Sequence, residues 1–429
     1  MIPASAFADS KGVNVTMPLV EKALRFLRNK ALDPPPEATM LRAGVIRVCG
    51  EDLAAPGCKI PGLFPPKKGV SGPDANRAWR GILESALAAA SLSRDDFDKT
   101  VFQRYVMDAM VEAMGDPSGF YILPSVYKKI SSIPEDFVGF GLRVHPTSDA
   151  LEIIAVHEGS PAYDAGLLHG DRIIRINGKG VSGVRRPIAL AALWGADGHK
   201  IRVSVTRRGG VTRDIKICYS PWSFTPFFLE RHGDMISIHV RYFGKGLTKT
   251  VARELAGSCG GLVLDLRNAA AGGEDEMIAL ADLLLQKGSI GSKEMRGDLG
   301  SRKWTAKPGS PGERLDVPVA VVINGGTSGL AEIFASAIRK AGRGILIGRR
   351  SAGVDTQETI HPLRDGSAIQ ITSTRLKGPN DTSLVDGVLP HLETRRAEVV
   401  QLGMRVLDLT RGSGMNDLLE AARQAIALP

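Results

Sequence analysis

The stretch VPVAVVINGGTSGLAEIFASAIRKAG, residues 317–342, decides the fold class of the chain. It begins with an apolar run that predicts a buried strand, and the residues from Leu330 onward have the apolar spacing of a helix. The glycine-rich residues 324–329 between them predict a tight turn. A buried strand that turns directly into a helix is typical of α/β proteins.

The same alternation extends through the second half of the chain and predicts an α/β layer around a largely buried sheet. The runs expected to form strands are residues 234–243, 261–268, 318–325, 344–350 and 367–375. Helices are expected at residues 274–286, 331–342, 395–409 and 415–428.

The first half of the chain has two other patterns. Helical spacing at residues 17–32, 76–92 and 94–115 predicts a mainly helical N-terminal region, whereas residues 40–75 are rich in Gly and Pro and are expected to be irregular. From Phe137 the chain has short strand-like runs separated by turns. We therefore expect a multi-domain α+β chain. Its parts are a helical region at 1–136, a compact β unit at 137–210, the α/β core at 211–395 and a helical segment at 396–429.

The composition limits the classes of function. Of the 429 residues, 43% are hydrophobic, which is ordinary for a folded chain. The net charge of +9 comes from scattered basic residues and only 5% of residues are aromatic, so we expect no nucleic-acid partner. A basic surface favours acidic partners or peripheral contact with an anionic membrane. No apolar stretch approaches the roughly 20 residues that span a bilayer.

Small residues near the N-terminus, Ala4-Ser5-Ala6, resemble a signal-peptidase site, although the charged and apolar parts of a signal are missing. We therefore expect a periplasmic or otherwise exported chain whose signal has been removed. The alternative is that this resemblance is accidental.

Four cysteines bear on the same question. Cys49 and Cys58 flank a turn-rich segment whose ends can meet, so export predicts a disulfide between them. Cys218 and Cys259 each lie beside an expected strand and form a second candidate pair. The alternative is four buried free thiols in a cytosolic protein. Because the chain has neither a CxxC motif nor a Cys/His cluster, we expect no metal site and no cofactor.

Several motifs, in one order along the chain, resemble those of the carboxy-terminal processing proteases, also called tail-specific proteases. They include FVGFGL (137–142), GLVLDLRN (261–268), PVAVVINGG (318–326) and ILIGRRSAG (345–353). The resemblance covers roughly residues 80–392. It implies a PDZ domain at 137–210 and a ClpP- or crotonase-like protease core at 211–395.

The resemblance places both catalytic positions on residues that lack the chemistry. The family's nucleophile is a serine three residues before a glutamate, and aligning Glu332 with that glutamate puts Gly329 in its place. Aligning GRRSAGVD (348–355) with the family's lysine stretch puts Val354 at the position of the base. Serine needs a base to become a strong nucleophile, and glycine and valine supply neither group. The resemblance therefore implies a pseudoprotease.

The surroundings of these positions also depart from the family. NAAAG (268–272) replaces Asn-Asn-Pro-Gly-Gly, whose backbone helps to form the oxyanion hole, and a glutamine beyond the lysine becomes Glu358. Ala270, Ala271 and Gly272 then form a vestigial oxyanion region.

Ser328, one residue before the nucleophile position, has two interpretations. It is a displaced nucleophile, or it caps the helix that begins near Leu330. Between Arg343 and Arg375 the chain has no lysine, and His361 is the one histidine there, which argues against a base for Ser328.

In PDZ domains, the loop before a strand binds the terminal carboxylate of a peptide, which then adds as an extra strand. The matching residues are Phe137, Val138, Gly139, Phe140, Gly141 and Leu142. The alternative is that these residues pack the domain core and that the groove is covered.

We therefore expect a catalytically inactive homologue that binds peptide tails or a partner protein as a scaffold or regulator. One alternative is an active serine peptidase that uses Ser328. Another is a decoy or regulatory subunit of an active paralogue. Whether the chain forms a homo-oligomer stays open.

Overall fold

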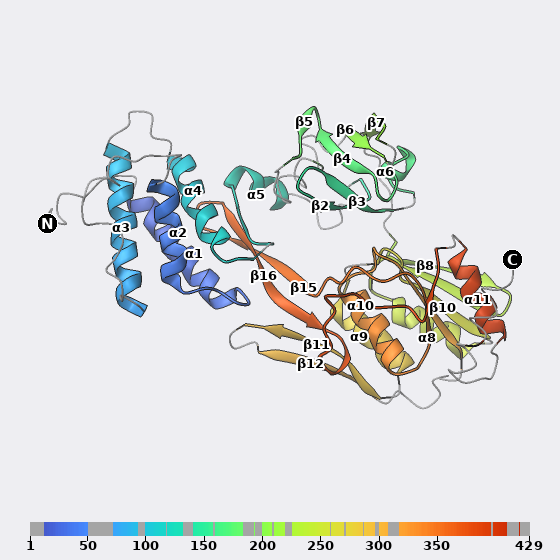
Figure 1. The fold of residues 1–429 in the computed structure, drawn as a ribbon. Helices are drawn as coiled ribbons and strands as arrows, with labels where there is room; N and C mark the ends of the chain where they lie inside the picture. Colours follow the sequence, from blue (N-terminus) through green and yellow to red (C-terminus); the bar gives the residue numbers. More distant parts are fainter. Residues whose placement is uncertain are drawn as a thin grey trace. The chain divides into compact units, whose positions relative to one another are not determined.

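The computed structural model describes most of the chain, as two compact units (Figure 1). The described residues are 13–49, 72–92, 99–116, 118–131, 140–157, 159–182, 193, 200–207, 210–218, 225–257, 259–269, 272–285, 287–296, 300–307, 317–395, 398–409 and 420. Unit 1 takes its described residues from 1–135, 295–299 and 358–374, and unit 2 from 136–294, 300–357 and 375–429.

Unit 1 is built around helices of the N-terminal region. They are α1 (Val13–Lys30), α2 (Glu37–Cys49), α3 (Gly72–Leu92), α4 (Lys99–Glu112) and α5 (Pro124–Ser131). The apolar faces of α1–α4 share one core, in which Leu27, Leu41, Leu83 and Met107 are fully buried. The three helices predicted from spacing are confirmed as α1, α3 and α4. None of the helices in the described ranges is both long and apolar enough to span a membrane.

The expectation of irregular structure at residues 40–75 is wrong for its first part, because residues 40–49 belong to helix α2. Residues 50–71 lie outside the described residues. Gly44 explains why composition misleads here. A Cβ added to Gly44 would lie 3.3 Å from Val106 Cγ1, so this glycine permits close packing of α2 on α4 instead of ending the helix.

Unit 1 also contains a segment from much later in the sequence. Strand β1 (Phe120–Ile122) pairs antiparallel with β16 (Ala368–Lys377), with Phe120 opposite Gln370. The apolar pattern assigns residues 358–374 to the α/β core, but the structure groups them with the helices. The physical reason is burial, since Leu363 and Ile369 pack into the core that α1–α4 share.

A small β domain in unit 2 has its own apolar core. Its elements are β2 (Leu142–Pro146), β3 (Leu151–Val156), α6 (Pro161–Asp164), β4 (Arg172–Ile176), β5 (Lys179–Gly180), β6 (Lys200–Thr206) and β7 (Thr212–Cys218). The antiparallel sheet has the order β2-β3-β4-β6-β7, with β5 paired to β4. Strand β2 ends this order, so among the described residues no further strand pairs with its outer edge.

The second sheet of unit 2 is the α/β core that the apolar runs predict. Its strands are β8 (Phe227–His232), β9 (Met235–Val240), β10 (Gly261–Asp265), β13 (Val319–Ile323), β14 (Ile345–Gly348) and β17 (Leu392–Glu393). Their order is β17-β14-β13-β10-β9-β8, parallel except for the antiparallel pair of β8 and β9. Every residue of β10 and β13 is buried, as expected for strands covered on both faces.

Helices cover both faces of this sheet (Figure 1). On one face lie α8 (Leu247–Ala256), α9 (Glu274–Leu284) and α10 (Leu330–Lys340), and on the other lies α11 (Val399–Leu409). Outside this sheet, β11 (Gly288–Met295) and β12 (Ser301–Ala306) pair antiparallel, and β15 (Thr356–Pro362) pairs with β16. The carboxyl ends of β10, β13 and β14 meet at one edge, which is where open α/β sheets place their ligand sites.

Candidate functional site

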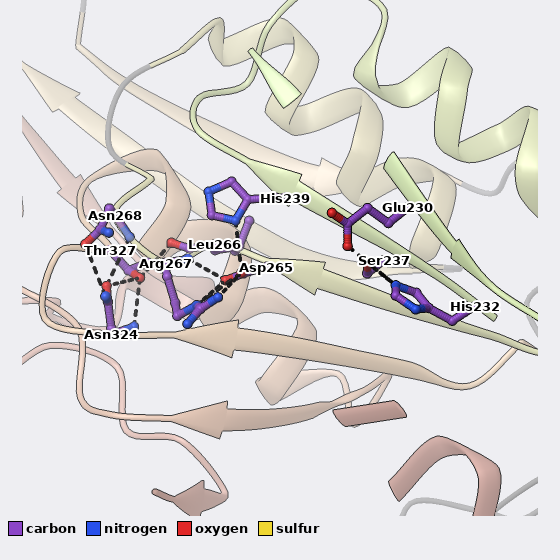
Figure 2. A network of polar contacts seen from close by, with 10 residues as sticks. All are labelled: Glu230, His232, Ser237, His239, Asp265, Leu266, Arg267, Asn268, Asn324 and Thr327. Carbon is purple, nitrogen blue, oxygen red and sulfur yellow. Dashed lines mark hydrogen bonds and ion pairs between the residues drawn. The ribbon is translucent and has the colours of Figure 1, made fainter. Parts of the chain in front are cut away.

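The turn after β13 is fixed to the turn after β10 by side-chain hydrogen bonds (Figure 2). The Asn324 Oδ1 atom accepts from the backbone N–H of Asn268 at 3.0 Å, and Asn324 Nδ2 donates to Asn268 Oδ1 at 3.1 Å. The Thr327 hydroxyl donates to the carbonyl of Leu266 at 2.8 Å. Gly326 must lack a side chain, because a Cβ there would lie 2.3 Å from Asn268 Oδ1.

Gly329 ends this turn as the N-cap of α10. Its backbone has φ +61° and ψ −121°, a combination that residues with a Cβ rarely adopt. Serine hydrolases hold their nucleophile on a strained strand-to-helix turn of this kind. The structure therefore gives Gly329 the backbone of a nucleophile position without a nucleophilic side chain.

Glu332 connects this turn to the segment that follows β14. Its carboxylate is fully buried, and its Oε1 accepts from the Ser351 hydroxyl at 2.5 Å and from the Gly353 N–H at 2.6 Å. Its Oε2 accepts from the N–H of Gly329 at 3.0 Å and from the N–H of Val354 at 2.9 Å. One oxygen atom therefore brings together the two positions that the alignment assigns to nucleophile and base.

The electrostatics of Glu332 reflect burial. Desolvation raises the pKa of its carboxyl above the ordinary value and outweighs the hydrogen bonds from Ser351, Gly353, Val354 and Gly329, which favour the charged form. At the base position, Val354 offers an aliphatic side chain that is 41% exposed and has no atom that accepts a proton.

The interpretation of Ser328 as a helix cap is wrong, because the N-cap of α10 is Gly329. Leu330 is the first residue of the helix, as expected. Ser328 is 4% exposed, and its N–H donates to the carbonyl of Ala269 at 2.9 Å. His361 belongs to unit 1, where its ring stacks on Phe26.

Of the vestigial oxyanion region, Ala270 and Ala271 lie outside the described residues. Gly272 has φ +144° and forms a parallel bridge with Phe243. A Cβ at Gly272 would lie 2.4 Å from the Phe243 nitrogen, so only glycine fits there. Glu358, the departure beyond the base position, lies in β15.

A second polar cluster surrounds Asp265 at the end of β10 (Figure 2). The Asp265 carboxylate is bonded to His239 Nδ1 at 2.9 Å and to Arg267 Nη2 at 2.7 Å. Burial acts to raise the pKa of Asp265, but the hydrogen bonds from His239 and Arg267 outweigh it and hold the pKa below the ordinary value. Sequence reasoning missed this cluster, because the contact of His239 depends on the register that places it opposite Asp265 in the parallel pair.

The proposed peptide loop is described only in part, since Phe137, Val138 and Gly139 lie outside the described residues. Phe140 is buried in the core of the β domain, and its carbonyl accepts from the Ala162 N–H at 2.9 Å. Gly141 has φ +77°, which favours glycine. Leu142 is partly buried and begins β2, whose outer edge pairs with no other strand in the described part of the chain.

The expected pair of Cys218 and Cys259 is wrong, because neither cysteine forms a disulfide. Cys218 ends β7 in the β domain, whereas Cys259 is buried in the α/β core, where its thiol donates to the Gly261 carbonyl at 3.4 Å. Cys58 lies outside the described residues, so a bond between Cys49 and Cys58 stays a prediction. Among the described side chains, no group of three or more His, Cys, Asp or Glu is placed to hold a metal ion.

Comparisons with known proteins support one family. Residues 235–394 match the model of peptidase family S41, and residues 152–207 match that of a PDZ domain. The chain is a homologue of the carboxy-terminal processing serine proteases. These matches, with the strand order described above, confirm the fold class expected from the sequence, an α/β protease-like core with a PDZ domain.

Two relatives and one solved structure illustrate this homology. The chain is 27% identical over 349 residues to the carboxy-terminal processing protease CtpA of Bacillus subtilis (strain 168), covering 76% of this chain and 72% of that protein. It is 24% identical over 292 residues to a probable CtpA-like serine protease of Staphylococcus aureus (strain N315), covering 67% of this chain and 58% of that protein. The fold is similar to that of the photosystem II D1 C-terminal processing protease, with a TM-score of 0.65 and 19% identity, over 94% of this chain and 99% of that one.

Proposed function

We propose that this chain is a catalytically inactive homologue of the carboxy-terminal processing proteases and that it binds polypeptide C-termini or a partner protein. The observation that carries the proposal is the shared contact of Gly329 and Val354 with Glu332 Oε2. The neighbouring positions that would hold nucleophile and base have no group to acylate and no group to take a proton.

The location of Ser328 argues against a displaced nucleophile. Its side chain is almost fully buried, and its backbone is bonded to Ala269. A nucleophile must reach the carbonyl carbon of a substrate, which requires an accessible hydroxyl beside a base. Ser328 therefore suits packing of the turn better than attack on a substrate.

The β domain supports the binding part of the proposal. Addition of a peptide strand requires a sheet edge with unpaired backbone groups, and the outer edge of β2 supplies one among the described residues. Gly141, which precedes β2, has the positive φ that a loop needs to turn backbone amides toward a ligand. The proposed ligand is a free chain terminus, whose carboxylate accepts hydrogen bonds from that loop.

A fluorophosphonate probe tests the loss of catalysis, since it reacts covalently with activated serine hydroxyls. We expect no adduct on the chain under conditions that label chymotrypsin fully, and no cleavage of a peptide with an apolar C-terminal tail. An adduct on Ser328 in mass spectrometry, abolished by Ser328→Ala, would contradict the proposal and identify an active peptidase.

A further inference from the structure

A cavity of about 610 Å³ lies in unit 1, between helix α1 and the turn that joins β15 to β16. Volumes in this range are typical of sites for small molecules. Leu19 and Phe26 of α1 supply apolar wall, and the Phe26 ring stacks on His361 with centroids 4.0 Å apart and planes within 9°. These two rings form a flat platform at the cavity.

Basic side chains dominate the charge around this platform. Lys22, Arg25 and Lys30 line the cavity from α1, and Arg364 lines it from the turn. No acidic side chain in the described ranges forms an ion pair with any of these four residues. Residues three, four or eight positions apart share a helix face, so α1 directs its cations to the same side.

The acidic residues at the cavity have partners elsewhere. Glu21 lies 3.2 Å from Arg80 Nη1, in an ion pair between α1 and α3. The Asp365 carboxylate accepts from Gln103 at 2.5 Å and from the Ser367 hydroxyl at 2.6 Å. Arg80 therefore offsets the charge of Glu21, whereas the donors to Asp365 are neutral and leave its charge in place. Four cations against this one carboxylate leave an excess of positive charge at the cavity.

The pKa of His361 reflects the positive charge at the cavity. Burial lowers the pKa of its imidazole first, and the positive charges of Lys22 and Lys30 lower it further. The neutral ring that results stacks on Phe26 without adding charge. The cavity thus combines an apolar, flat surface with an excess of positive charge.

We propose that this cavity binds a small organic anion, a carboxylate carried on a flat apolar group. The apolar group lies against Leu19 and the Phe26–His361 platform, and the carboxylate lies among Lys22, Lys30 and Arg364. Charge-assisted hydrogen bonds supply orientation, and burial of the flat group supplies affinity. All residues that line this cavity belong to unit 1.

The first test is calorimetric titration of the full chain with 2-naphthoate and with its neutral isostere 2-naphthamide. We expect 2-naphthoate to bind, and 2-naphthamide to bind about tenfold more weakly or not at all, because it lacks the charge that the cations recognise. Equal affinities, or no binding of 2-naphthoate, would overturn the proposal.

Matched variants on one helix locate the site. Lys22→Gln should weaken 2-naphthoate binding about tenfold. Arg28→Gln removes the same charge from α1, but Arg28 does not line the cavity, so its affinity should stay within about twofold. Equal losses in both variants would show a general effect of net charge and overturn the assignment.

A resonance of His361 gives a readout that does not depend on affinity alone. An anion beside the ring offsets the charges of Lys22 and Lys30, so saturating 2-naphthoate should raise the pKa of His361 in an NMR titration. The other charged residues that line the same cavity are Glu21, Arg25, Arg364 and Asp365, and they are the same in the titrations with and without 2-naphthoate. An unchanged His361 pKa at saturation would place the ligand elsewhere.

Discussion

The turn after β13 and the edge strand β2 differ in the kind of group that each would use in its proposed role. In the turn, Gly329 has φ +61° and its N–H is bonded to Glu332, but glycine offers no nucleophilic side chain. Strand β2 keeps an edge open to strand addition among the described residues. Catalysis needs particular side chains, whereas strand addition uses main-chain groups that survive most substitutions. Under the proposed function, recognition of a chain terminus would outlast catalysis in one chain.

A double variant with serine and lysine at the two assigned positions tests how far the core is from catalytic activity. Gly329→Ser combined with Val354→Lys should leave peptidase activity several orders of magnitude below that of an active serine protease. The serine would have to adopt a strained backbone, and the alignment puts Ala271 in place of a glycine of the family's oxyanion region. Single-turnover cleavage of a tail peptide measures the effect, and efficient turnover by the double variant would show that only two side chains separate this chain from an enzyme.

Glu332→Ala tests whether the retained backbone depends on the buried carboxylate. The substitution leaves the Ser351 hydroxyl and the N–H groups of Gly329, Gly353 and Val354 without their acceptor, so we expect a loss of about 4 kcal/mol in the free energy of unfolding. Urea denaturation measures it. As a control, Glu294→Ala removes a partly exposed ion pair with Lys377 and should cost less than about 1 kcal/mol. Equal losses would mean that Glu332 does not hold the turn.

Amidation of a peptide ligand tests whether the β domain recognises the terminal carboxylate of a chain. A peptide that ends in apolar residues should bind with its free carboxylate and lose roughly 1.5–2 kcal/mol, about tenfold or more in Kd, when that terminus is amidated. Fluorescence anisotropy with a labelled pair of peptides measures the difference. If both forms bind equally, the β domain recognises something other than a chain terminus.

The buried carboxyl groups of Asp265 and Glu332 should contribute to stability with opposite pH dependence, because the pKa is lowered for Asp265 and raised for Glu332. Because the pKa of Asp265 is lowered in the fold, its contribution is present above the ordinary value of 3.8 and is lost as the pH falls through the lowered pKa. Asp265→Asn should therefore cost on the order of 1–2 kcal/mol at neutral pH, and that cost should shrink in acid. Urea midpoints at several pH values measure it, with exposed Asp386→Asn as the control.

The contribution of Glu332 to stability should change with pH in the direction opposite to that of Asp265. Because its pKa is raised, its contribution is fully present below its ordinary value of 4.5 and decreases as the pH rises through the raised pKa. A cost of Glu332→Ala that grows with pH would contradict this direction.

Much of the core and of its candidate site could be predicted from local pattern. The apolar run at 318–325 predicts β13, and the following turn and helix lie where the sequence places them. The alignment of Glu332 assigns Gly329, and the alignment of residues 348–355 assigns Val354. Two predictions were wrong because they depend on packing between distant segments. Residues 40–49, which include Gly44, form part of a helix despite their composition, and residues 358–374 group with the N-terminal helices and not with the α/β core.

The sequence by itself determined the α/β alternation, the β domain and which residues the alignment puts at the positions of nucleophile and base, because periodicity and motif order are local properties. Only the tertiary structure decided which residues meet. It brought Gly329 and Val354 to one oxygen of Glu332, joined His239 to Asp265, and gathered Lys22, Lys30 and Arg364 around one cavity. Such contacts depend on strand register and on the packing of distant segments, which no short stretch of sequence specifies.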